Sequence, residues 1–389
     1  MSCQKFIFKG YIIVVCLFLT ETHSRCTTTF ITTCEKVSDV SRQGKNEWKN
    51  LIISNDQCSK TISSAPNEIL KPGGFQKTTN LEELFIIEKV NEIQPGAFNG
   101  LNQLTYLKLY KNRVKVIPRG AFSNLTQLFK LDLQDNSIEN IEHGLFQDSS
   151  ISVINLSYNK VNNIQVDKLD LPGLRKLIFT NNDISLMVSG CFHENLEYLN
   201  LDNNQIVEIE EGVLKPLQNL KELILSNNKL NGIEISFTLP NLEKLDLSHN
   251  EIQGIKEGSF KEFFELKFLY LGYNRITYLN PSVFPEDSNL QILHLHQNAL
   301  MNLDERVGTN LPYLKEMSIG GNPWACPCLE VIVQYFDKKN IQQPECEREF
   351  FDSGISAVCW VTGDKCTGDE VLTTKIYNDF KEAIKTPTC

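Results

Sequence analysis

The sequence predicts an α/β solenoid shaped as a curved horseshoe. It would have a parallel sheet on its concave side, irregular and short-helical chain on its convex side, and disulfide-stapled caps. Three observations predict this fold. An 11-residue pattern of apolar residues with one Asn, as in "LEKLDLSHNEI" from Leu242 to Ile252, occurs in ten copies. Successive copies begin 22 to 24 residues apart, and cysteines gather before and after them.

The pattern L-x-x-L-x-L-x-x-N at this period is the leucine-rich-repeat signature. Within each copy x-L-x-L-x forms a short strand, so alternate side chains point to opposite faces and the Leu residues point inward. One coil cannot bury its own Leu residues, and the stacking of coils therefore supplies the core. An Asn amide both donates and accepts, so it can satisfy backbone groups at the turn after the strand. We expect a structural ladder of Asn112, Asn136, Asn159, Asn182, Asn204, Asn228, Asn250, Asn274, Asn298 and Asn322.

The second half of each coil predicts an aromatic spine on the convex side. Stretches such as "PGAFNGL" at Pro95 and "PSVF" at Pro281 put a Phe at the same point of successive coils, and we expect the aliphatic Leu214 and Leu169 to take that place in two others. A degenerate copy begins at Leu81, as expected of a unit that caps the core. The residues expected to stack are Phe98, Phe122, Phe146, Phe192, Phe260 and Phe284.

The first 24 residues predict a signal peptide. Lys5 and Lys9 are followed by the apolar run 11–19, which is too short to span a membrane. No second apolar run approaches the roughly 20 residues of a membrane helix, so we expect no membrane span and a secreted, extracellular protein. A net charge of −10 and a pI near 5.3 argue against a nucleic-acid partner, which requires a basic surface.

The cysteines fit an oxidising compartment. Ten remain once Cys3 and Cys16 leave with the signal peptide, and an even set predicts disulfides. Cys191 and Cys58 occupy inward positions, where we expect a free, buried thiol. A bridge between Cys34 and Cys58 is the alternative. Otherwise one N-terminal and three C-terminal disulfides are expected among Cys26, Cys34, Cys326, Cys328, Cys346, Cys359, Cys366 and Cys389.

The segment after the last repeat, "NPWACPCLEVIVQYFDKKNIQQPEC", combines N-P-aromatic-x-C-x-C with an amphipathic helix and further cysteines. It resembles the C-terminal cap of extracellular leucine-rich-repeat proteins, and the repeats resemble those of Toll ectodomains and Slit. The resemblance implies disulfides Cys326–Cys346 and Cys328–Cys366, with Cys359 and Cys389 as extra cysteines. In organisation the chain resembles short arthropod immune leucine-rich-repeat proteins that lack a coiled coil.

The expected organisation has five parts. A signal peptide (1–24) precedes an N-terminal cap (25–50), about 11 or 12 repeats (51–322), a cysteine-rich cap (323–366) and a short tail (367–389). Apolar residues recur every four positions in the tail, which predicts one amphipathic helix that packs on the cap rather than a dimer zipper. These residues are Leu372, Ile376, Phe380 and Ile384.

The sequence offers no motif for catalysis. It contains no nucleophile motif, phosphate-binding loop or H-E-x-x-H sequence, so we expect neither an enzyme nor a cofactor. The Cys326-x-Cys328 pair in a secreted chain indicates disulfides rather than zinc. His294 and His296 point onto the concave face, with His249 roughly 10 Å along the stack. We interpret these histidines as solvated surface rather than as a metal or pH-sensing site.

Aromatic residues that point outward from the strands mark the expected ligand-binding surface, because Tyr, Trp and Arg dominate binding hot spots. A C-terminal group contains Phe268, Tyr270, Tyr273, His294 and His296, and an N-terminal group contains Phe85, Tyr106 and Tyr110. Sequons predict glycosylation at Asn124, on the convex side, and at Asn155. A glycan at Asn155 would cover the middle of the concave sheet.

The function expected from these features is non-enzymatic recognition by a secreted protein. We expect a role in arthropod innate immunity and a protein or microbial-surface ligand bound through the solenoid face. The alternative is an extracellular adhesion or guidance protein of the matrix or cell surface. One fold hosts many ligands, so the choice of ligand rests on the surface residues and not on the fold.

Overall fold

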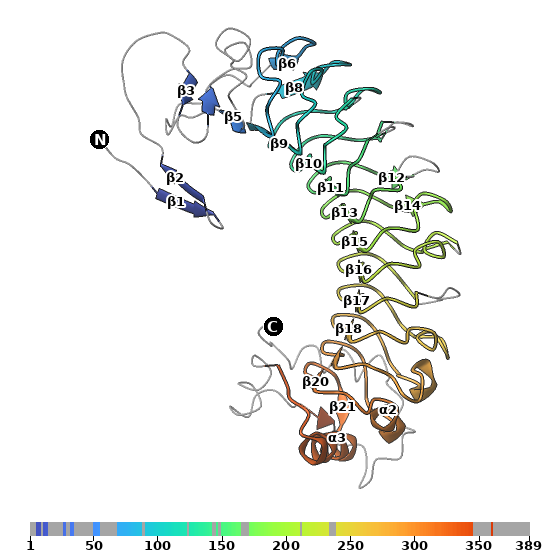
Figure 1. The fold of residues 1–389 in the computed structure, drawn as a ribbon. Helices are drawn as coiled ribbons and strands as arrows, with labels where there is room; N and C mark the ends of the chain where they lie inside the picture. Colours follow the sequence, from blue (N-terminus) through green and yellow to red (C-terminus); the bar gives the residue numbers. More distant parts are fainter. Residues whose placement is uncertain are drawn as a thin grey trace.

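Figure 1 shows the computed structural model as an arc of stacked coils. The structure describes residues 68–344, with gaps at 88–89, 123, 142–144, 147–148, 165–170, 211 and 233–238, together with residues 5–8, 11–14, 26–28, 32–34, 50–54 and 359–360. Strands follow one another along the inner edge of the arc, and irregular chain forms its outer side. The α/β solenoid with a parallel concave sheet, predicted from the repeat, is confirmed.

One 14-stranded sheet lines the concave side. Its strands are β3 (Cys26–Thr28), β4 (Thr32–Cys34), β5 (Asn50–Ser54), β7 (Glu83–Ile87), β9 (Tyr106–Tyr110), β10 (Lys130–Asp132), β11 (Val153–Asn155), β13 (Lys176–Ile178), β15 (Tyr198–Asn200), β16 (Glu222–Ile224), β17 (Lys244–Asp246), β18 (Phe268–Tyr270), β19 (Ile292–His294) and β20 (Glu316–Ser318). They lie in chain order, and the pairs from β4 to β20 are parallel. Equivalent Leu residues pair across the sheet, so the buried rows are continuous through the stack.

Each ladder Asn joins two coils. Oδ1 of Asn228 accepts a hydrogen bond from the backbone N–H of Ile206 in the preceding coil at 3.0 Å. Its Nδ2 donates to the carbonyl of Leu201 in that coil at 2.9 Å and to the carbonyl of Leu225 in its own coil at 3.0 Å. Corresponding bonds hold the other nine side chains, all of which are buried. The Asn residues therefore fix the stacking as well as the turn.

The Phe spine on the convex side is divided into two stacks. The rings of Phe75, Phe98, Phe122 and Phe146 follow one another with centroids 6.0 to 6.1 Å apart. Phe260 and Phe284 stack at 5.8 Å. Phe192 is buried but makes no ring contact among the described residues. The buried Leu214 takes the place of a Phe in the next coil, as the sequence predicts, and Leu169 lies outside the described residues.

The remaining elements are short. On the convex side, β6 (Glu68–Leu70) pairs with β8 (Val90–Ile93), and β12 (Asn163–Ile164) pairs with β14 (Leu186–Met187). The 3₁₀ helix η1 (Pro281–Val283) and helix α2 (Glu305–Thr309) follow, while β1 (Lys5–Phe8) and β2 (Tyr11–Val14) form a separate antiparallel pair. None of the helices in the described part of the chain combines the length and apolar composition needed to cross a membrane.

The C-terminal cap closes the open end of the core. Strand β21 (Trp324–Ala325) leads into helix α3 (Cys326–Lys339), and β21 pairs in parallel with β22 (Cys359–Trp360). Helix α3 buries Leu329, Ile332 and Phe336 against the last coil, which would otherwise expose its apolar rows. The helix ends at Asn340, whose left-handed conformation (φ 53°) stops it.

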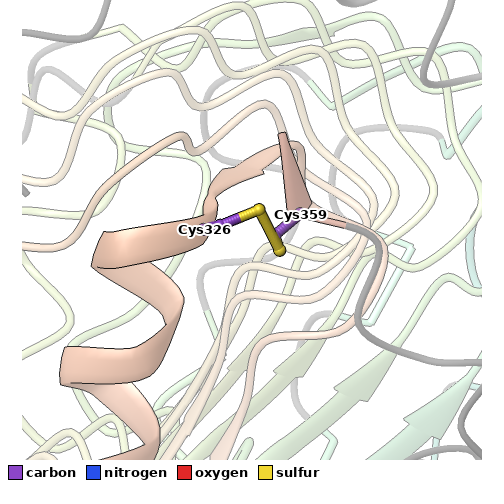
Figure 2. Close-up of a disulfide and its surroundings, with 2 residues drawn as sticks. All are labelled: Cys326 and Cys359. Atoms are coloured by element: carbon purple, nitrogen blue, oxygen red, sulfur yellow. A yellow bond between two sulfur atoms is a disulfide. The ribbon is translucent and has the colours of Figure 1, made fainter. Parts of the chain in front are cut away.

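The disulfide within this cap differs from the one that the resemblance implies. Cys326 pairs with Cys359, with Cα atoms 4.7 Å apart (Figure 2). The implied Cys326–Cys346 pair is therefore wrong: the β21–β22 register brings residue 359 beside Trp324 and so next to Cys326. Cys328 is also disulfide-bonded. Its implied pairing with Cys366 stays a prediction, because Cys366 lies outside the described residues.

Two further expectations concern the other cysteines. Cys191 is a free thiol buried in the core, as expected, and burial raises its pKa to about 12. The antiparallel register of β3 and β4 sets Cys26 opposite Cys34, and the predicted disulfide between them stays a prediction. Cys58, Cys346, Cys389 and the four apolar residues of the predicted tail helix lie outside the described residues.

Candidate functional site

The concave sheet presents two regular rows of outward side chains. In most of its strands a buried residue stands between two half-buried ones, so the first and third positions face the inside of the arc. Parallel pairing places equivalent residues of adjacent coils side by side, as Asp246, Tyr270 and His294 are. This geometry lets residues about 24 positions apart form one surface.

Five rings on three successive coils form what we call the aromatic–histidine cluster: His249, Tyr270, Tyr273, His294 and His296. His249 stacks on Tyr273 with centroids 4.1 Å apart. Tyr273 meets His296 edge-on at 5.1 Å, and Tyr270 meets His294 edge-on at 4.9 Å. His294 and His296 are 5.7 Å apart and connect the two pairs. The rings thus hold one another in place before any ligand arrives.

A glycine makes room for the centre of this cluster. Gly272 stands beside His296 in the adjacent coil, and a Cβ at residue 272 would lie 2.5 Å from Cε1 of His296. Nδ1 of His296 hydrogen-bonds with Oγ of Ser318 at 2.6 Å. Burial lowers the pKa of His296 to about 4, and the neighbouring His294 and His249 act in the same direction. His296 is therefore an uncharged part of the surface at neutral pH.

Carboxylates border the cluster. Nε2 of His294 lies 2.8 Å from Oε1 of Glu316, a hydrogen bond that becomes an ion pair when the ring is protonated. Asp246 is the neighbour of Tyr270 in the sheet and accepts hydrogen bonds from the backbone N–H and the hydroxyl of Ser248. Burial raises the pKa of Tyr270, and the charges of Asp246 and Glu316 add to this effect. Both carboxylates thus act electrostatically at the same tyrosine.

The N-terminal aromatic group is only partly assembled. Phe85 and Tyr106 meet edge-on with centroids 4.9 Å apart. Tyr110 lies at the far end of β9, where Lys108 Nζ is 4.7 Å from its ring centroid. Burial raises the pKa of Tyr106, and the nearby Asp132 contributes to the shift. Lys108 and Lys130 lie over the rings of Tyr110 and Tyr106. The N-terminal group is therefore a basic surface rather than a purely aromatic one.

The structure changes the membership of the predicted C-terminal group. Tyr270, Tyr273, His294 and His296 are brought together as expected. Phe268 begins β18 in the first outward row and is half-buried, but it makes no ring contact among the described residues. His249 belongs to the cluster through direct contact with Tyr273. Its position directly before a ladder Asn, which it shares with Tyr273, is the sequence signal that identifies it.

The two predicted glycosylation sites lie on opposite sides of the coils. Asn124 is exposed in a convex turn with φ 67°. Asn155 ends β11 and faces the inside of the arc, where its Oδ1 accepts hydrogen bonds from the backbone N–H and the hydroxyl of Ser157. Since Ser157 is the third residue of the sequon, both residues that an oligosaccharide transferase reads are engaged in the folded sheet. Attachment at Asn155 must therefore precede folding of this coil.

Neither a metal site nor a polar cleft competes with this surface in the described part of the chain. No group of three or more His, Cys, Asp or Glu side chains there is arranged to hold a metal ion. A pocket of about 310 Å³ lies between coils and is lined mostly by core residues such as Leu225, Leu245 and Phe263, with Glu208 as its charged group. Such a lining provides no acid–base pair for catalysis.

The repeated strand, the ladder Asn and the stacked core define a solenoid whose concave sheet carries the exposed functional groups. The leucine rich repeat family model matches residues 88–138, 126–184, 194–239, 234–276 and 264–323, which together make up more than half of the chain. The protein belongs to the leucine-rich-repeat family. A search of curated proteins found no significant match.

Several solved structures share the fold. The leucine-rich repeat domain of APL1 is 21% identical, with a TM-score of 0.59 over 77% of this chain and 73% of that one. A chain of the LRIM1/APL1C complex is 23% identical, with a TM-score of 0.53 over 67% and 52% of the two chains. A chain of the octameric complex of Latrophilin 3, Unc5D and FLRT2 is 22% identical, with a TM-score of 0.52 over 68% and 76%. This chain spans about half the length of the LRIM1/APL1C chain and of a chain from the TLR13–ssRNA13 complex.

Proposed function

We propose that this protein is a secreted, non-enzymatic recognition protein of arthropod innate immunity. It binds a protein or microbial-surface ligand through the concave face of the solenoid. The family and the fold support a binding role. The resemblance to short secreted arthropod immune proteins, and the presence of APL1 and LRIM1/APL1C among the similar structures, support the narrower assignment.

One observation carries the proposal. The aromatic–histidine cluster joins five rings from three coils into a single patch, in which His249 is exposed and the other four rings are half-buried. Rigid amphipathic rings lose little conformational entropy on binding, so a patch of this kind contributes much of the affinity of an interface. The ring contacts prepare the patch in the free protein, and ligand binding does not have to order it.

Glycosylation would divide the concave face. A glycan at Asn155 on β11 would stand between the N-terminal aromatic group on β7 and β9 and the cluster on β17 to β19. Because a glycan is bulky and hydrated, it would exclude a large flat ligand from the middle of the sheet. The ligand then engages the C-terminal half. Peptide mass spectrometry of the secreted protein measures the occupancy of Asn155.

The proposal is tested by capture from extracellular fluid of the source animal. The protein with Phe268→Ala and Tyr270→Ala should be secreted normally but should retain at least about tenfold less of the partner that the unaltered protein captures. The matched control is Tyr278→Ala with Tyr313→Ala, since these tyrosines are 46% and 59% exposed and lie outside the concave strands. Equal capture by the Phe268/Tyr270 variant would refute the proposal.

The identity of the captured partner separates the immune role from the alternative. A microbial-surface component, or a body-fluid protein that appears after infection, supports recognition in immunity. A matrix or neuronal cell-surface protein as the dominant partner would instead assign the chain to adhesion or guidance. Either partner should depend on the same aromatic surface.

A further inference from the structure

The two halves of the concave sheet differ in charge. In the outward rows of β7 to β13, three lysines (Lys108, Lys130 and Lys176) stand against two carboxylates (Glu83 and Asp132). In the same rows of β15 to β20, three carboxylates (Glu222, Asp246 and Glu316) stand against one lysine (Lys244). The half that carries the aromatic–histidine cluster is therefore the acidic half.

Two of these carboxylates differ from those at the edge of the sheet. Along the edge, successive coils alternate in charge and form ion pairs, with Lys221 at 2.7 Å from Glu197 and Lys267 at 2.9 Å from Glu243. Among the described residues, the carboxylate of Asp246 accepts hydrogen bonds only from Ser248. The carboxylate of Glu316 hydrogen-bonds with His294, whose ring is uncharged when unprotonated. Within the part of the chain that the structure describes, neither carboxylate forms an ion pair with a lysine or an arginine.

The aromatic rings of the sheet attract cations within the chain itself. Lys176 Nζ lies 3.8 Å from the ring centroid of Tyr198, and Lys130 Nζ lies 4.3 Å from that of Tyr106. At Tyr270 the corresponding cation is more distant: Lys244 Nζ lies 5.6 Å from the ring centroid, close to the roughly 6 Å limit of a cation–π interaction. Tyr270 also has Asp246 beside it on one side and Glu316 two strands away on the other.

We propose that the C-terminal half of the concave face binds a basic polypeptide segment and seats an arginine or lysine side chain on Tyr270 between Asp246 and Glu316. The assignment rests on the proposed function, since it names the chemistry of the ligand for the same surface. Arginine suits the site well, because its planar guanidinium stacks on an aromatic ring while it donates to carboxylates. Anionic ligands would meet repulsion from the three carboxylates in this half.

The test uses synthetic probes and the full-length secreted protein. A peptide of alternating Arg and Ser is the probe, and the same peptide with Glu in place of Arg is the negative probe. The site variant carries Asp246→Asn and Glu316→Gln. These substitutions keep the shape of both side chains, and the amide introduced at position 246 retains an oxygen that can accept from Ser248.

The control variant carries Glu257→Gln and Glu286→Gln, two exposed carboxylates outside the strands. Both variants remove the same amount of negative charge, so nonspecific attraction of a basic peptide to an acidic protein changes equally. A difference between the two variants therefore reports on the position of the carboxylates and not on their number.

Isothermal titration calorimetry at about 0.15 M salt gives the outcome. We expect the Arg–Ser peptide to bind the unaltered protein and the control variant with affinities within about twofold, and the site variant at least about tenfold more weakly. The Glu–Ser peptide should not bind. The inference is overturned if the Arg–Ser peptide does not bind, if the two variants weaken binding equally, or if the Glu–Ser peptide binds as well.

The outcome is independent of the test of the proposed function. If partner capture depends on Phe268 and Tyr270 while the Arg–Ser peptide is insensitive to Asp246 and Glu316, only the basic nature of the ligand is refuted. If partner capture is unaffected by the aromatic substitutions, the concave surface itself is the wrong site. Circular dichroism of both charge variants confirms that the repeats are folded before either comparison is made.

Discussion

At the scale of single residues, the ladder Asn contributes strongly to the free energy of unfolding. Removal of the Asn228 amide leaves a buried N–H of Ile206 and the carbonyls of Leu201 and Leu225 without this partner. The two carbonyls keep the amides of Asn204 and Asn250 as donors, so of these three groups only the N–H of Ile206 is left unsatisfied. A buried group left unsatisfied costs about 1–3 kcal/mol. We therefore expect Asn228→Ala to lower the free energy of unfolding by about 1–3 kcal/mol, measured by urea denaturation.

The matched control for this substitution is Asn231→Ala, because Asn231 is exposed and lies in the same coil. Its cost should stay within about 0.5 kcal/mol. Asn227 is also exposed, but it is unsuitable as the control because its φ is 54° and Ala would be strained there. Equal destabilisation by Asn228→Ala and Asn231→Ala would contradict the account of the ladder.

The ladder could be predicted from the sequence, and the left-handed position beside it could not. Every coil must satisfy the same buried backbone groups, so the same residue recurs and the repetition is visible. The preceding position is left-handed in residues as different as Lys111, Tyr158 and Gln297. The interlocked backbone of the coils imposes that conformation whatever the side chain, so the residue type at this position does not reveal it.

At the scale of elements, the contacts between coils give the aromatic–histidine cluster its properties. Because residue 272 is a glycine, the ring of His296 fits against the backbone of the neighbouring coil. The cluster therefore buries a titratable side chain. The pKa of His296 is about 4 in the folded protein and about 6.5 in the unfolded chain. Between these pH values the unfolded state binds more protons, so stability falls as the pH falls.

This linkage predicts a measurable loss. Between pH 7 and pH 4, His296 should contribute a decrease of up to about 3 kcal/mol in the free energy of unfolding. The contribution is complete above pH 6.5 and is lost as the pH approaches 4. Urea denaturation at several pH values should show a shallower dependence for His296→Gln than for the unaltered protein. Identical pH profiles would show that His296 titrates normally.

In the C-terminal cap, the helix can be predicted from the sequence but the disulfide pairing cannot. Helix α3 and the cysteines around it can be recognised from "NPWACPC", since the helix must cover the last coil. The partner of Cys326 cannot be recognised, because it depends on the β21–β22 pairing across a separation of 33 residues. Likewise, a regular pattern predicts that Tyr270 and His294 are neighbours, whereas the contact of His249 with Tyr273 depends on the left-handed turns that carry both rings.

At the scale of the whole molecule, the repeat determines the scaffold and the non-repeated residues determine the function. The outward rows vary from coil to coil, and this variation concentrates rings and carboxylates at the C-terminal half while lysines gather at the other. Figure 1 shows that the strands that carry both halves face the same hollow of the arc. A ligand within that hollow therefore meets a surface that changes from basic to acidic along the stack.

Hydroxyl-radical footprinting of the protein with its captured partner tests the central claim most directly, because it reports on individual aromatic side chains. We predict that the partner reduces oxidation of Tyr270, Tyr273 and His294. Oxidation of Tyr278 and Tyr313, outside the concave strands, should not change. Protection confined to Tyr278 and Tyr313, with Tyr270 and Tyr273 oxidised as in the free protein, would contradict recognition through the C-terminal half of the concave face.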